Sequence, residues 1–95
     1  MQAIDIQSEE FLESLRLGKQ EAFQVLFEAF HKPLCFFAAR VVRDGEEAED
    51  IVQEVFLSFW KMERDGFPNI KTIKTFFYNS VQNRCLNYLR DLEIR

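Results

Sequence analysis

The chain has 95 residues, of which 47% are hydrophobic and eleven are phenylalanine. This length and composition predict one small domain with one core, and they exclude an intrinsically disordered chain. The net charge of −4 argues against a general nucleic-acid binder, which is usually basic. The charge is uneven, however. Residues 1–70 carry 7 basic and 14 acidic side chains, whereas residues 71–95 carry 5 basic and 2 acidic ones, which indicates two partners of opposite charge.

The apolar residues recur with helical spacing, and no stretch alternates for long with the period of two that strands show. A first helix is predicted over residues 8–17, with Ser8 as its N-cap and Gly18 at its end. A second helix is predicted over residues 19–42. Its apolar stripe stays in phase across Pro33, so we expect the proline to kink the helix rather than end it.

A third helix is predicted over residues 45–62, with Asp44 as N-cap and Glu47 at the third helical position. One side of this helix is apolar, and the other carries Glu46, Glu47, Glu49, Asp50, Gln53 and Glu54. Two interpretations stay open. The acidic side is a solvated surface that favours the helix N-terminus, or it is a docking surface for a basic helical partner with Ile51 or Val52 as apolar anchor.

The fourth helix is predicted over residues 71–92, and it is not simply amphipathic, because Arg84 falls within its apolar stripe. It mixes cations with aromatic and amide side chains, a combination that suits unpaired DNA. The alternative is an ordinary core helix with a polar back. Together the four segments predict an all-α fold, a compact bundle of about four helices.

Motifs for catalysis or cofactor binding are missing from the sequence, so we expect no enzyme, no cofactor and no metal. His31 and Cys35 could form a pair, but two such residues without further ligands are a weak metal signal. Cys35 and Cys85 are interpreted as free, buried thiols. The chain shows neither a signal peptide nor an apolar run of about 20 residues, which predicts a cytoplasmic protein without membrane insertion.

Two motifs carry a resemblance to a known family. Residues 48–60, AEDIVQEVFLSFW, resemble the core-binding helix in the second conserved region of bacterial sigma factors. They are followed by FFYNSVQNRCLNYLR at residues 76–90, and the pair resembles the extracytoplasmic-function (ECF) subfamily over roughly residues 8–93. The resemblance implies a region-two bundle that binds the RNA polymerase core and recognises and melts the promoter minus-ten element.

In that family the third helix docks on the clamp coiled coil of the largest polymerase subunit, which presents arginines. The resemblance assigns this contact to Asp50, Gln53 and Glu54, with Ile51 as the apolar neighbour. Carboxylates suit such a partner because arginine–carboxylate pairs are directional and often bidentate.

The resemblance also implies that a base of the non-template strand is flipped into a pocket formed by the loop of residues 64–71. Family positions at or near the DNA match Thr75, Phe76, Tyr78, Asn79, Gln82 and Asn83. Arg64 and Lys71 at the ends of this loop and Lys74 on the helix are further candidate DNA-binding residues. Asn83 belongs to the clearest part of the match. Phe76 could instead be a core residue, and Arg84 could be a structural ion-pair partner rather than a DNA ligand.

The chain departs from the family in one respect, since an ECF sigma factor has a second helical domain, region four, which is absent here. We therefore expect this chain to be a fragment of a longer protein. An anti-sigma factor is a compatible further partner. The alternative function is a helical protein-interaction module that does not bind DNA.

Overall fold

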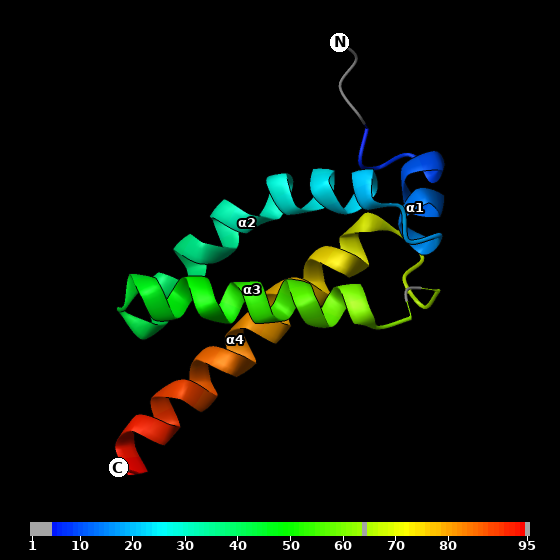
Figure 1. The fold of residues 1–95 in the computed structure, drawn as a ribbon. Coiled ribbons are helices and arrows are strands. Elements are labelled where there is room, and N and C mark those ends of the chain that lie inside the picture. Colours follow the sequence, from blue (N-terminus) through cyan, green and yellow to red (C-terminus); the bar gives the residue numbers. More distant parts are fainter. Residues whose placement is uncertain (1–4, 64, 95) are drawn as a thin grey trace.

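The computed structural model describes residues 5–63 and 65–94, and this part of the chain forms four helices and no strand (Figure 1). Helix α1 spans Glu9–Arg16, α2 spans Gln20–Val42, α3 spans Gly45–Lys61 and α4 spans Ile70–Ile94. The predicted all-α bundle is confirmed. Helices α2, α3 and α4 pack on one another, and α1 lies beside the start of α2.

Helix α1 begins and ends where its local signals place it. The Ser8 hydroxyl accepts a hydrogen bond from the amide of Phe11 at 3.1 Å, as an N-cap does. Gly18 has a φ of 75°, a left-handed conformation that glycine adopts without steric cost. The amide of Lys19 bonds to the carbonyl of Ser14, as in a Schellman motif. The chain therefore turns sharply into α2.

A short connection joins α2 to α3. Arg43 ends α2 in the left-handed conformation, with a φ of 58°. The Asp44 carboxylate then accepts from the amides of Glu46 and Glu47 at 3.1 and 3.2 Å, so the predicted N-cap is confirmed. These bonds satisfy amides that a helix start leaves without partners. The short connection reverses the chain, so α2 and α3 run antiparallel (Figure 1).

The two prolines of the chain occupy different kinds of position. Pro33 lies inside α2, which continues to Val42, so the helix does not end there. Pro68 precedes Asn69, whose side-chain oxygen accepts from the Thr72 amide at 3.0 Å. Asn69 therefore caps the start of α4, a role that the sequence analysis did not assign to it.

Aromatic side chains fix the three long helices around one core. Phe77 of α4 is fully buried, and its ring centroid lies 5.7 Å from that of Phe30 and 5.1 Å from that of Phe59. The rings are tilted or edge-on, the arrangement that aromatic pairs favour. Every described residue that is buried is hydrophobic.

Among residues 5–63 and 65–94, the helices lack the combination of length and hydrophobicity that a membrane-spanning helix requires.

Candidate functional site

Helix α3 separates its apolar and acidic residues onto opposite sides. Its buried residues are one, three or four positions apart and share one side of the helix: Ala48, Ile51, Val52, Val55 and Phe59. The predicted docking residues Asp50, Gln53 and Glu54 are all exposed on the other side. The structure therefore brings these three polar side chains together on one accessible surface.

The apolar anchor that the sequence analysis expected beside them is not on that surface. Ile51 is only 4% exposed and Val52 is fully buried, so both belong to the core. Ile51 follows Asp50 by one residue, a rotation of about 100° around the helix, which turns it into the core. Any apolar contact with a partner must come from other residues.

An apolar groove lies next to the acidic surface. Leu57 and Trp60 of α3 are 56% and 42% exposed, and Gln53 belongs to both the groove and the acidic surface. The groove encloses about 520 Å³ and runs between α3 and the first half of α2. It is lined by Gln20, Phe23, Gln24, Phe27, Gln53, Phe56, Leu57 and Trp60. Sequence analysis missed it because its walls come from two helices.

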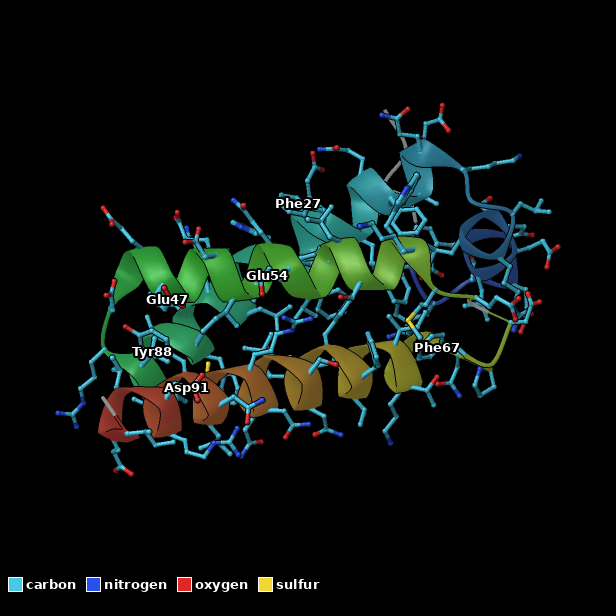
Figure 2. The ribbon with its side chains drawn as sticks, turned by 60° about the horizontal axis from the view of Figure 1, so that its bottom comes forward. Phe27, Glu47, Glu54, Phe67, Tyr88 and Asp91 are labelled. Carbon is cyan, nitrogen blue, oxygen red and sulfur yellow. The ribbon has the colours of Figure 1, made fainter. Side chains whose placement is uncertain are left out.

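Glu54 is bridged to α4. Its Oε2 accepts from Nη1 of Arg84 at 2.7 Å, and Nη2 of Arg84 donates to the Ser58 hydroxyl at 3.2 Å. The open interpretation of Arg84 as an ion-pair partner is thereby confirmed. Figure 2 shows Glu54 on α3, alongside α4. Both side chains are well exposed, so the pair contributes little to stability, but it links the acidic surface to the basic helix.

Most of the residues predicted to lie near DNA are exposed on α4: Lys71, Lys74, Thr75, Asn79, Gln82 and Asn83. Tyr78 is half-buried, with its ring edge-on to Phe37 of α2 at 5.3 Å. Arg64 lies outside the described residues. The α4 surface thus carries cations and amides side by side, without a cluster of buried polar groups.

Phe76 is partly buried and packs against the core of the bundle, as the core interpretation of this residue expects, and its contact with DNA stays a prediction. Its ring lies 5.5 Å from that of Phe67 and 6.0 Å from that of Phe59. Phe67 belongs to the loop before α4 and is labelled in Figure 2. The carbonyl oxygen of Phe67 accepts from Nη2 of Arg16 at 3.0 Å, so α1 holds the loop from the other side. This end of the loop is fixed by its ring and by its backbone.

A second hollow, of about 320 Å³, lies beside the start of α4. One wall is the end of the loop and the start of α4, as far as Lys71. The other wall is the segment that leads into α1. The lining residues are Ile6, Gln7, Ser8, Glu9, Leu12, Pro68, Asn69, Ile70 and Lys71. The N-terminal wall could not be predicted, because it comes from the opposite end of the chain.

The histidine–cysteine pair is part of the aromatic packing. Nε2 of His31 lies 3.6 Å from Sγ of Cys35, and the His31 ring stacks on Phe27. Burial raises the pKa of the Cys35 thiol above its ordinary value of 9.0, and the Glu49 carboxylate raises it further. No cluster of three or more metal-ligating side chains occurs within residues 5–63 and 65–94.

These features define a helical domain with an acidic surface on one helix and a basic surface on the next. The family model for Sigma-70 region 2 matches residues 26–93, and the chain belongs to this family. This family consists of transcription initiation factors. The sigma-factor resemblance is thus confirmed, whereas the ECF assignment stays a prediction.

The chain is also similar to the RNA polymerase sigma-H factor of Pseudomonas aeruginosa. The two are 25% identical over 83 residues. The alignment covers 87% of this chain and 42% of that protein, so the chain spans less than half the length of this relative. No solved structure gives a significant match.

Proposed function

We propose that this domain binds the RNA polymerase core through α3 and promoter DNA through α4. The observation that carries the proposal is the exposed acidic surface of α3, which lies directly beside an apolar groove. Membership of the Sigma-70 region 2 family and similarity to a sigma-H factor support the choice of partners.

The α3 surface fits a helical partner that presents arginines, the clamp coiled coil of the polymerase. Asp50 and Glu54 are one helical turn apart, so their carboxylates project on the same side. Arg84 occupies Oε2 of Glu54, which leaves Oε1 to accept from an incoming arginine. Leu57 and Trp60 supply the apolar contact that Ile51, in the core, does not provide.

The α4 surface fits unpaired DNA of the minus-ten element. Lys71 and Lys74 attract phosphates, and amide groups such as those of Asn79 and Asn83 pair with base edges. The hollow beside Lys71 is the proposed receptor for a flipped base. Extrusion of a base costs a few kcal/mol, which contacts in such a hollow must offset.

The docking assignment is tested by titrating the chain with the isolated clamp coiled coil in a calorimeter. Glu54→Lys should lower the affinity by more than about 30-fold, because a like charge then faces the partner's arginines. Glu93→Lys, the same charge reversal at the exposed end of α4, should bind like wild type. Wild-type affinity in a folded Glu54→Lys variant would remove α3 as the docking surface.

The DNA assignment is tested with a labelled single strand that carries a minus-ten sequence. Asn83→Ala should weaken binding roughly 5- to 150-fold if the amide reads a base. Asn87→Ala is the matched control, since Asn87 is also exposed on α4. A chain that binds the clamp coiled coil but shows no DNA binding even at low salt is instead a protein-interaction module.

A further inference from the structure

The outward side of α2 carries a surface that the proposed function does not use. Lys32, Phe36 and Arg40 follow one another at intervals of four residues, so they share one side of the helix, and Arg43 is exposed at its C-cap. This side is turned away from the core, to which α2 contributes residues such as Leu34. We call these four residues the basic face of α2.

The basic face is exposed, and its cations form no salt bridge with the residues that the structure describes. Phe36 is 64% exposed, and the three cations are exposed as well. Among the described residues, the ion pairs are formed by Arg16 and Arg84, not by the cations of this face. Residues 29–43 contain no acidic side chain, although the chain as a whole is acidic. The face therefore concentrates positive side chains on an acidic protein, with the nearest acidic residues of the sequence, Glu28 and Asp44, at its two ends.

The basic face borders the α4 surface to which DNA is assigned. Phe37 follows Phe36 and packs edge-on to Tyr78 of α4. Arg40 lies three residues after Phe37, so the two are neighbours on the surface of α2. In Figure 1, α2 and α4 both run from the right of the view to the left. Arg40 therefore stands next to the seam between the two helices.

We propose that the basic face of α2 binds single-stranded DNA, as a continuation of the α4 surface. Phe36 lies one helical turn from both Lys32 and Arg40, a spacing of about 6 Å. An aromatic ring between two cations can stack on a base while the cations meet the adjoining phosphates. The proposal rests on the DNA-binding function assigned to α4.

The composition of the face favours nucleic acid over a protein partner. The core of a protein interface combines several large apolar side chains and is depleted of charged ones. On the basic face, Phe36 is the one strongly exposed large apolar residue among residues 28–43, and three cations surround it. This ratio is typical of surfaces that follow a phosphate backbone.

The test measures binding of the intact chain to a labelled oligothymidylate by fluorescence anisotropy at several salt concentrations. The binding constant K should fall as salt rises. Lys32→Ala and Arg40→Ala should each reduce the magnitude of the slope of log K against log salt concentration by about 0.7, the value for one phosphate contact with a single strand. Phe36→Ala should weaken binding roughly 5- to 150-fold and leave the salt slope unchanged, because stacking releases no counterion.

Lys19→Ala is the matched control, since Lys19 is an exposed cation at the other end of α2. It should leave both affinity and salt slope unchanged. Thermal unfolding of each variant checks that the fold is retained. We expect no loss of stability, because these side chains are exposed.

Lys74→Ala on α4, measured alongside, separates the two proposals. If Lys74→Ala weakens binding and the three α2 variants do not, the basic face is not a DNA site and the α4 assignment stands. If only the α2 variants weaken binding, the α4 assignment fails, and with it the proposal that the basic face continues an α4 surface. Two other results would overturn the proposal. In the first, the folded wild-type chain does not bind the oligothymidylate even at low salt. In the second, the chain binds anionic lipid vesicles but not DNA, and the α2 substitutions abolish the binding to vesicles.

Discussion

Helices α3 and α4 lie side by side in the bundle, yet they divide their residues in different ways. Helix α3 keeps one apolar side in the core, and its exposed side is acidic as far as Glu54 and carries Leu57 and Trp60 beyond it. Helix α4 buries Ile73, Phe77, Val81 and Cys85, and has no buried residue beyond that point. Its last two turns expose apolar side chains such as Leu92 and Ile94.

The difference shows what each helix does for the domain. In α3 the buried residues support the core, and the exposed acidic residues are the surface proposed to bind a partner. In α4 the first part supports the core and also presents cations and amides, while the last part extends past the core. The position of a residue along α4 therefore matters as much as the side on which it lies.

The largest expected effect comes from the point where the two helices share the core. Phe59→Ala and Phe77→Ala should each lower the free energy of unfolding by about 3–5 kcal/mol, since both rings are fully buried. Their centroids are 5.1 Å apart, so the effects should not be additive in the double variant. Urea unfolding measures both.

Phe36→Ala is the control for the same deletion on an exposed side chain, and it should change the free energy of unfolding by less than about 0.5 kcal/mol. Equal losses in all three variants would contradict the assignment of Phe59 and Phe77 to the core.

The next effect concerns the side-chain caps at the starts of the two helices. Asp44→Ala and Asn69→Ala each remove a side-chain cap and should lower the free energy of unfolding by about 1 kcal/mol. Asp44→Asn should retain most of this stability, because asparagine caps helices about as well as aspartate. Chemical unfolding followed by circular dichroism provides the measurement, and an equal loss in Asp44→Asn would show that charge, not capping, matters there.

A smaller effect is expected where α4 contacts the acidic surface of α3. Arg84→Ala should lower the free energy of unfolding by about 0.2–1 kcal/mol, because the pair with Glu54 is exposed. A double-mutant cycle with Glu54→Gln isolates the interaction, and added salt should reduce it. A coupling energy that does not respond to salt would indicate a contact other than the ion pair.

The smallest effect concerns the buried thiol of α4. Burial raises the pKa of Cys85 above its ordinary value of 9.0. The folded state is therefore favoured while the thiol is protonated, and this contribution is lost as the pH rises above 9.0 through the folded-state pKa. The wild-type chain should lose more stability than Cys85→Ala between about pH 8 and about pH 10. Parallel pH profiles of the two proteins would contradict this.

The sequence predicted those parts of the fold that depend on local signals. Ser8 and Asp44 cap the helices they precede, and Gly18 ends α1, because each needs only its chain neighbours. The cap at Asn69 was missed, because the predicted helix began at residue 71 and Asn69 was therefore assigned to the loop that follows Pro68.

The candidate site was predictable only in part, because burial depends on where other helices lie. Asp50 and Glu54 were placed on an exposed side correctly, but Ile51 sits where the acidic side meets the core. The groove at Leu57 and Trp60 requires α2, far away in the sequence. The polymerase and DNA contacts of these residues stay predictions.

The short connection at Arg43 and Asp44 also bears on how the chain folds. Closing a short loop costs little entropy, and contacts between neighbouring helices form before those that span longer segments. We expect α2 and α3 to be structured in the folding transition state, with α4 docking later. Substitutions in this pair should then slow folding, whereas those in the last turns of α4 should mainly speed unfolding.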